Sequence, residues 1–221
     1  MKKKYLVLTI LFVLPLVAYL FFASGVNNFA KLPVLKEDVL NVSAFSDVEL
    51  NKKISVLFFL GNNINQRQGD ALNLNQKIYK RFYEFEDFQF VVICPKGTEQ
   101  LASNLKNKLE SGTNTDMKKW NFIFSQPSDI RNLFNSLKSD TNLDENYGSH
   151  HVYIVDKDRS QRGRNDDSGI KFGYDSRSVA DINNFMVDDV KIILAEYRLA
   201  CLLYTSPSPR DSDTSRMPSS A

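Results

Sequence analysis

The chain has 221 residues, of which 43% are hydrophobic and 12% aromatic, and its formal net charge is +2. This composition suffices for one folded domain with appended segments and excludes a disordered chain. No cluster of lysine and arginine forms a basic face, so we expect no nucleic-acid partner.

The first predicted element is an apolar run without a charged residue, YLVLTILFVLPLVAYLFFASGV, residues 5–26. The run is as long as the ~20 residues that a helix needs to cross a bilayer, and it exceeds the apolar region of a cleaved signal peptide. Pro15 is compatible with this interpretation, because membrane helices tolerate proline. Residues 1–26 are therefore interpreted as a cytoplasmic lysine stub and an uncleaved transmembrane helix.

The orientation follows from the lysines at positions 2–4, which precede the apolar run. Positive residues next to a membrane helix stay on the cytoplasmic side. The sequence thus predicts a single-pass protein of the bacterial cytoplasmic (inner) membrane, with everything after Val26 on the periplasmic or extracytoplasmic side.

Residues 27–51 mix charged residues and asparagine with scattered apolar residues, and Pro33 interrupts them. We interpret this segment as a stalk or linker that leads into a short edge element.

Four short apolar runs follow, rich in β-branched and aromatic residues: ISVLFFL (54–60), FQFVVIC (88–94), NFIFS (121–125) and HVYIVD (151–156). Nearly continuous apolar runs of this length are typical of strands that are covered on both faces. They predict the central strands of a sheet.

Between and after these runs, apolar residues recur at steps of three and four, as on one face of a helix. The helical stripes run from Ala71 to Phe85, from Leu101 to Leu109, from Ile130 to Leu137 and from Val179 to Tyr197. Ser128 and Ser178 are the predicted N-caps of the last two helices.

Residues 151–164 and 169–176 have no helix between them and predict a hairpin whose turn is rich in Asn, Asp, Ser and Gly. The resulting order is β-α-β-α-β-α-β-β-α. This order predicts an α/β fold with a mostly parallel central sheet and helices on its faces.

Residues 201–221, CLLYTSPSPRDSDTSRMPSSA, switch abruptly to Ser, Pro, Asp and Arg without a hydrophobic period. Their first half is identical to a translated transposase sequencing adapter, so we interpret the segment as a non-native tail and exclude it from fold reasoning. The alternative is a natural disordered tail. On the first interpretation Cys94 is the one genuine cysteine, and no disulfide is expected.

The order of elements resembles the thioredoxin-like fold. KKISVLFFLGN, FQFVVICPKGTEQ, KKWNFIF and HVYIVDKDRSQRGR, together with the last helix, resemble the SCO/SenC family over residues 52–200. Members of that family are membrane-anchored, thioredoxin-like proteins that deliver copper or reduce thiols during cytochrome oxidase assembly. The resemblance implies a thioredoxin-like domain behind the N-terminal membrane helix.

The family's chemistry uses a CxxxC motif at the first strand-to-helix turn, where a helix N-terminus favours thiolates that bind Cu(I) or attack disulfides. In this chain the corresponding turn contains Gly61, Asn62, Asn63, Asn65 and Gln66. Carboxamides are poor Cu(I) ligands and do not exchange with disulfides. We therefore predict a degenerate site without catalytic residues, and copper is implied by the resemblance alone.

The family also places a histidine ahead of the hairpin strand, and His150 and His151 are the weak candidates for this metal ligand. Adjacent residues of a strand point to opposite faces, so the pair is not expected to chelate one ion. The alternative is a pair of histidines at the surface or strand edge.

Cys94 ends an apolar strand and precedes Pro95. It is either a lone reactive thiol or, as is commoner for cysteine at such a place, a small buried apolar group.

Three functions remain open from the sequence. The first is a non-catalytic binding or assembly factor, with a protein partner, in cytochrome oxidase or copper-protein maturation. The second is a single-cysteine thiol oxidoreductase that uses Cys94. The third is a general interaction domain of the cell envelope, which fold alone cannot distinguish from the first.

Overall fold

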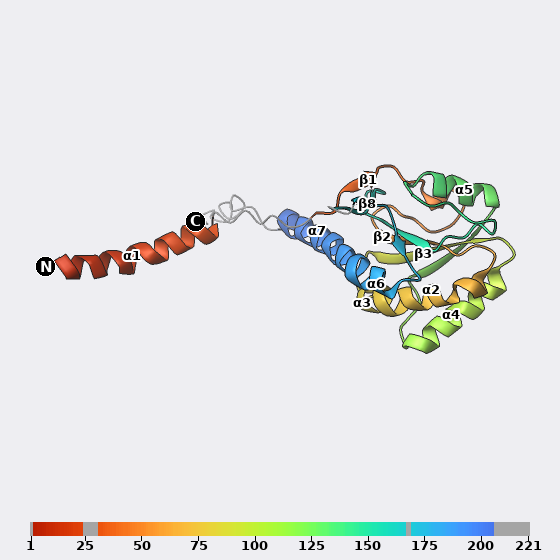
Figure 1. Ribbon diagram of the computed structural model, residues 1–221, viewed down its shortest axis with the longest axis horizontal. Helices are drawn as coiled ribbons and strands as arrows, with labels where there is room; N and C mark the ends of the chain where they lie inside the picture. The colour runs from red at the N-terminus through yellow and green to blue at the C-terminus, as the bar shows by residue number, and fades with distance from the viewer. Residues whose placement is uncertain (1, 24–30, 167–168, 206–221) are drawn as a thin grey trace, which may run out of the picture. The chain divides into compact units, whose positions relative to one another are not determined.

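The computed structural model describes residues 2–23, 31–166 and 169–205, and the chain divides into two compact units, Met1–Ala30 and Lys31–Ala221. The first unit holds α1 (Lys2–Ala23), which includes Pro15 and is drawn in red in Figure 1. Over the residues that are described, no helix combines the length and the apolar character needed to cross a membrane. The predicted transmembrane helix over 5–26 is therefore not shown, and residues 24–26 lie outside the described part.

The second unit is built on one mixed sheet (Figure 1). Its strands are β1 (Val34–Lys36), β2 (Ile54–Phe59), β3 (Phe88–Pro95), β4 (Trp120–Ser125), β5 (His151–Val155), β6 (Gln161–Arg162) and β9 (Tyr174–Asp175). The strand order is β1-β6-β5-β2-β3-β4, and β9 pairs with β5. β2, β3 and β4 are parallel, whereas β5 runs antiparallel to β2 and β6. The predicted α/β fold, with helices on both faces of a central sheet, is confirmed. The sheet is not mostly parallel as predicted, because β1, β5, β6 and β9 contribute four antiparallel pairings beside the two parallel ones.

The predicted hairpin is more elaborate than the sequence indicates. β5 first turns into β6 through the Asp156–Ser160 segment, and β7 (Arg164–Asp166) then pairs with β8 (Gly169–Lys171) in a separate two-stranded sheet. β9 returns to pair with β5, opposite the start of that strand.

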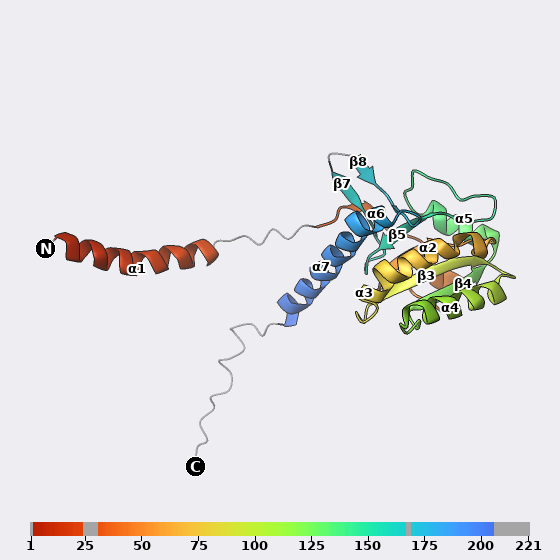
Figure 2. The same cartoon turned by 60° about the horizontal axis from the view of Figure 1, so that its bottom comes forward.

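Helices cover both faces of the sheet. They comprise η1 (Val42–Ala44), η2 (Ile64–Arg67), α2 (Gln68–Leu74), η3 (Asn75–Tyr79), α3 (Lys80–Phe82), α4 (Glu99–Thr113), α5 (Pro127–Asn135), α6 (Val179–Asp181), η4 (Ile182–Met186) and α7 (Val187–Thr205). Figures 1 and 2 show α2, α3, α4, α6 and α7 over one face and α5 over the other.

The strands are buried on both faces because successive side chains alternate between two apolar cores. Val56 and Phe58 of β2 face the core under α2 and α4, whereas Leu57 and Phe59 face the core under α5. This double burial explains why β2 and β3 have nearly continuous apolar sequences, each with a single polar residue, rather than alternating ones.

Two local predictions are wrong. Residues from Lys31 onward belong to the second unit rather than to a stalk, since Val39, Val42 and Leu50 are fully buried in the α5-side core. Their irregular spacing gives no period in the sequence. The short edge element expected in this segment is present as β1.

Ser128 is not an N-cap, because α5 already begins at Pro127, where a proline at the first position of a helix loses no hydrogen bond.

At the other end, Ser178 does cap its helix, since its hydroxyl oxygen accepts a 3.1 Å hydrogen bond from the amide of Asp181. α7 continues to Thr205, so the helical backbone extends into the first residues of the predicted non-native tail. Residues 206–221 lie outside the described residues.

Candidate functional site

The first strand-to-helix turn follows β2 and packs against the loop that precedes β5. Gly61 adopts a left-handed conformation (φ +71°), and a Cβ at this position would lie 2.5 Å from the carbonyl oxygen of Asn146. The amide of Asn62 donates a 2.8 Å hydrogen bond to that same oxygen. The turn is thus held in place by backbone contacts that require glycine at position 61.

The remaining predicted residues of the turn are polar and mostly open to solvent. Asn62, Asn65 and Gln66 are exposed, and Asn63 is half-buried at the start of η2. Their side chains present carboxamides, which offer hydrogen bonds but neither thiolate nor imidazole.

The residue that organises the turn is Arg67, which the sequence did not single out. It is only 3% exposed, and its Nη1 donates a 3.3 Å hydrogen bond to the carbonyl oxygen of Leu60. Its Nη2 forms an ion pair with Asp144. The guanidinium lies directly against Gly148, where any Cβ would overlap it.

Asp144, in the loop before β5, is the ionic partner of Arg67. Its Oδ1 accepts hydrogen bonds of 2.8 Å from the Asn146 amide and 2.9 Å from the Gly148 amide. Burial favours a higher pKa for Asp144, but the bonds from Gly148 and Arg67 outweigh it and hold the pKa below the usual 3.8. Asp144 is therefore ionised at neutral pH and fixes the Arg67 guanidinium in the turn.

A second polar contact joins α2 to the same loop. The Nδ1 of His150 lies 2.6 Å from a carboxylate oxygen of Asp70, and the two side chains are 36% and 8% exposed. The hydroxyl of Ser176 donates a 2.6 Å hydrogen bond to the His150 carbonyl, and the Ser176 carbonyl accepts one from Asn73. The His150 end of the loop before β5 is thereby attached to α2, directly through Asp70 and indirectly through Ser176 and Asn73.

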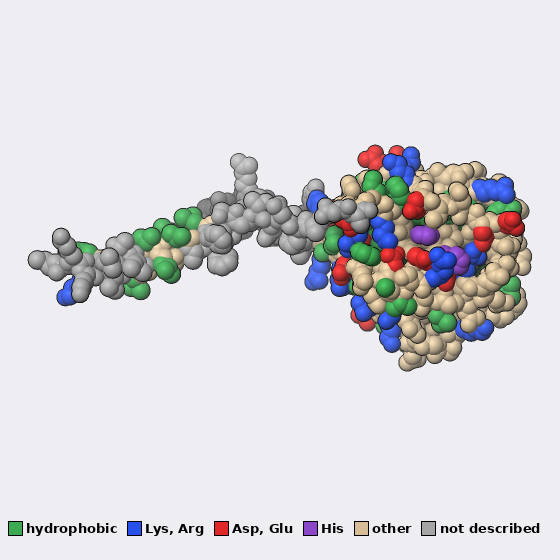
Figure 3. All heavy atoms as spheres, viewed as in Figure 1, with side chains coloured by type: hydrophobic (Ala, Val, Ile, Leu, Met, Phe, Trp, Pro, Cys, Tyr) green, Lys and Arg blue, Asp and Glu red, His purple; other side chains and the backbone are tan. Residues whose placement is uncertain are grey.

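His151 has a different neighbour. It begins β5 opposite Asp175 of β9, and its amide donates a 3.0 Å hydrogen bond to the Ser149 hydroxyl. Figure 3 shows the two histidines (purple) on one face, among acidic and basic side chains.

Within the described part of the chain, no group of three or more His, Cys, Asp or Glu is arranged to hold a metal ion. The groups at this turn do not fit Cu(I), which prefers thiolate and thioether ligands.

Cys94 lies on the neighbouring strand and is fully buried in the core beneath α2 and α4. Burial raises the pKa of its thiol to about 12, although a hydrogen bond with Thr98 acts in the opposite direction. A thiol with this pKa and no solvent access is not a nucleophile at neutral pH. Of the two interpretations of Cys94, the structure supports the small buried apolar group.

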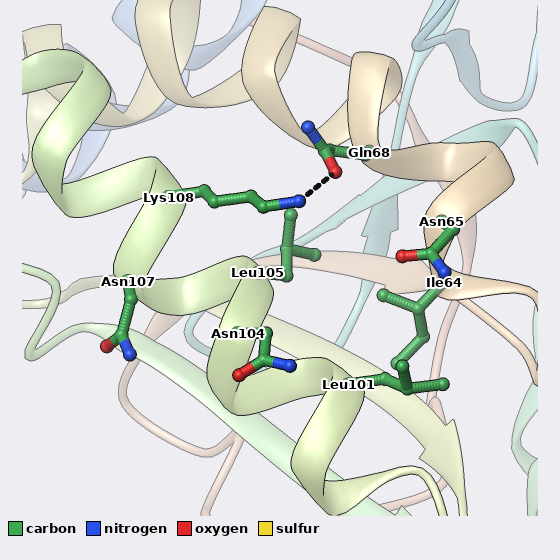
Figure 4. Close-up of a pocket in the computed structure, with 8 residues that line it drawn as sticks. All are labelled: Ile64, Asn65, Gln68, Leu101, Asn104, Leu105, Asn107 and Lys108. Atoms are coloured by element: carbon green, nitrogen blue, oxygen red, sulfur yellow. Dashed lines mark hydrogen bonds between the residues drawn. The ribbon is translucent and has the colours of Figure 1, made fainter.

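A groove of about 370 Å³ lies beside the turn, between η2–α2 and α4 (Figure 4). It is lined by Ile64, Asn65, Gln68, Leu101, Asn104, Leu105, Asn107 and Lys108. The Nζ of Lys108 donates a 2.9 Å hydrogen bond to Gln68 across the groove. Apolar side chains with carboxamides around them can bind a polypeptide through both shape and hydrogen bonds.

Sequence reasoning missed Arg67, Asp70 and Asp144, although one signal was present. Arg67, Asp70 and Leu74 are spaced by three and four residues, so both charges continue the apolar stripe of the first helix toward its start. Charged residues on the buried side of a helix need partners. Nothing in the sequence identifies those partners, which are 77 and 80 residues away.

Comparison with known proteins gives no match to a protein-family model and no match to a curated protein. Among solved structures, an SCO1/SenC family lipoprotein from Bacillus anthracis is 18% identical, with a TM-score of 0.42 over 78% of this chain and 99% of that chain. The soluble domain of Sco1 from Bacillus subtilis is 15% identical, with a TM-score of 0.37 over 64% and 79%. A thioredoxin-family thiol:disulfide interchange protein from Chlorobium tepidum is 15% identical, with a TM-score of 0.44 over 75% and 99%. The structural neighbours of this chain thus include both SCO/SenC and thioredoxin-family proteins.

Proposed function

We propose that this chain is a membrane-anchored domain of SCO/SenC type that acts by binding a protein partner, without thiol chemistry, during maturation of cytochrome oxidase or another copper protein. The observation that carries the proposal is the Arg67–Asp144 pair. It binds the first strand-to-helix turn to the loop before β5, in the place where the resemblance leads one to expect reactive cysteines.

The alternative thiol enzyme is disfavoured by the position of the sulfur. The Cys94 side chain is fully buried, and its raised pKa keeps it protonated at neutral pH. Neither disulfide exchange nor Cu(I) transfer can proceed through a thiol that no partner reaches.

The surface that supports binding is the groove of Figure 4, because it adjoins the turn and combines apolar and carboxamide side chains. Asn65 belongs to both the turn and the groove, whereas Asn104 approaches from α4. A partner polypeptide that enters the groove would contact Leu101 and receive hydrogen bonds from the amides.

Membrane anchoring is supported by the uncharged run of residues 5–26 and by the preceding lysines. An alkaline phosphatase fusion after Ala200 tests the orientation, because this reporter is active only outside the cytoplasm. We expect an active, membrane-bound fusion that alkaline carbonate does not extract. A fusion that is inactive or extractable would refute the anchor or its orientation.

The central experiment is affinity recovery from membranes of the native host with the tagged full chain. We expect recovery of oxidase subunits or copper proteins, and a clear loss of recovery for the variant Asn65→Ala/Asn104→Ala. The matched control is Asn132→Ala/Asn135→Ala, which removes two exposed carboxamides of α5 on the opposite face of the sheet. Recovery of unrelated envelope proteins alone would instead support a general interaction domain.

A titration with Cu(I) in reducing buffer tests copper directly. We expect no tight stoichiometric site, since the turn offers no thiolate and Cys94 is buried. A tight site of one ion per chain would contradict the proposal.

A further inference from the structure

The two edges of the central sheet differ in how they are protected. β1 forms one edge; it has three residues, ends in Lys36 and pairs with β6 in an irregular register. Short, charged or irregular strands are the usual means by which proteins protect a sheet edge from other chains. β4 forms the opposite edge and has none of these features.

β4 has the sequence WNFIFS, without a charge or a proline, and it keeps a continuous register with β3 from Trp120 to Ser125. Among the residues that the structure describes, β4 pairs with β3 alone. The carbonyl groups of Lys119 and Ser125 accept hydrogen bonds from Phe90 and Lys96, so the odd-numbered residues bond toward β3. Because successive residues of a strand bond to opposite sides, Phe122 and Phe124 direct their amide and carbonyl groups to the open edge.

A groove of about 360 Å³ follows this edge and lies between β4 and α4, which Figure 2 shows side by side. Phe122 and Phe124 line it and are only half-buried. An uncharged strand of this kind, with aromatic side chains beside an open row of backbone groups, is suited to pair with another strand.

The acidic and basic side chains that line the groove lie at its opposite ends. Glu99, at the start of α4, lies at the end of β4, because its near neighbour Lys96 bonds to Ser125. Lys106 and Lys118 lie toward the beginning of the strand. Lys118 also pairs with Asp116 at 2.8 Å, so it is oriented at that end of the groove. Among the side chains that line the groove, the negative charge therefore lies at one end and the positive charges lie at the other.

We propose that β4 pairs antiparallel with β4 of a second copy of this chain, about a two-fold axis, so that the two sheets become continuous. An antiparallel arrangement brings the beginning of each strand to the end of the other. Glu99 of each copy then faces Lys106 and Lys118 of the other copy, and the open backbone groups of Phe122 and Phe124 gain partners.

A second copy fits this edge better than an unrelated extended peptide does. An extended peptide would pair with the backbone groups of β4. A second copy also places a cation opposite Glu99 and a carboxylate opposite the two lysines, because two-fold symmetry turns the same groove end for end. The proposed contact lies along the β4–α4 edge and leaves Asn65 and the loop before β5 outside it.

The test is sedimentation equilibrium of the full chain in a detergent of matched density, over a wide range of protein concentration. We expect a reversible dimer for the unaltered chain. Glu99→Lys gives the groove two positive ends, and Lys106→Glu/Lys118→Glu gives it two negative ends, so each variant alone should lose about tenfold or more in dimer affinity. The control Glu145→Lys makes the same change of charge on an exposed loop residue outside the groove and should not alter the affinity.

An equimolar mixture of the two charge variants should restore the dimer, because one copy then supplies the cations and the other the carboxylates. Restoration also shows that both variants are folded. The proposal is overturned if the unaltered chain is monomeric at every concentration. This is also the result expected if β4 binds an extended peptide of another protein instead of a second copy. The proposal is equally overturned if the dimer is insensitive to both variants, or if the mixture does not restore it.

Discussion

The ends of two neighbouring parallel strands, β2 and β3, differ in solvent access and in whether they carry sulfur. β2 leads into an accessible turn without sulfur, in which Asn62 and Gln66 are exposed. Next to the end of β3 lies the sulfur of Cys94, which is fully buried. The two places are adjacent, since the amide of Leu60 donates a 3.0 Å hydrogen bond to the carbonyl of Ile93.

This comparison shows that the position of a residue on the fold decides its chemistry as much as its type does. A thiol at the end of β3 is desolvated, and its pKa rises to about 12. At the end of β2 the chain is open to solvent and a helical segment begins, which is where a thiolate would be stabilised. Arg67 and Asp144 occupy that region instead.

The largest expected effect comes from placing sulfur in the accessible turn. Asn62→Cys/Gln66→Cys should yield thiols that react with iodoacetamide in the folded chain at neutral pH, whereas Cys94 does not react until the chain unfolds. An exposed thiol has a pKa near ~8.5, so its thiolate fraction exceeds that of Cys94 by a factor of about 10³. Labelled peptides identified by mass spectrometry distinguish the positions. Equal labelling rates for Cys94 and the introduced cysteines would invalidate the comparison.

The next largest effect is a loss of stability when the Arg67–Asp144 ion pair of the turn is removed. Arg67→Ala leaves the Leu60 carbonyl without its donor and Asp144 without its cation, and should lower the free energy of unfolding by about 2–4 kcal/mol. Urea denaturation of the full chain measures this loss. The control Arg177→Ala removes a 57% exposed arginine that pairs with Asp175, and should cost less than about 1 kcal/mol. Equal losses for the two variants would mean that the Arg67 pair does not stabilise the turn.

A smaller effect is expected in the dependence of stability on pH. The folded-state pKa of Asp144 lies below its usual 3.8, so its contribution is present above that value and is lost as the pH falls through the folded-state pKa. The stability difference between the unaltered chain and Asp144→Asn should therefore shrink between about pH 5 and about pH 2. Because Asp144 is 41% exposed, solvent screening limits the contribution to about 1 kcal/mol. A difference that is constant over this range would argue against an ionised Asp144 in the pair.

The sequence predicted the central strands well because burial on both faces produces a continuous apolar run. The apolar runs that begin at Ile54, Phe88 and His151 correspond to β2, β3 and β5 almost to the residue. The segment before Ile54 was missed for the opposite reason, since Val39, Val42 and Leu50 reach the core at irregular intervals from a chain without a regular period.

Of the candidate site, the sequence predicted only the absence of cysteine and not the contacts that build it. The absence of cysteine from Gly61 to Gln66 is visible in the sequence, but the pairs Arg67–Asp144 and Asp70–His150 join segments that only the folded chain brings together. Asn65 was recognised as part of the turn, whereas its groove with Asn104 depends on how α4 packs beside α2. Such contacts have no local pattern from which to infer them.

The most direct test of the central claim, that the domain acts through binding without sulfur, is recovery of partners from host membranes with the variant Cys94→Ala. The account predicts the same partners in the same yield as for the unaltered chain. Loss of the partners by a variant that unfolds at the same urea concentration as the unaltered chain would contradict it.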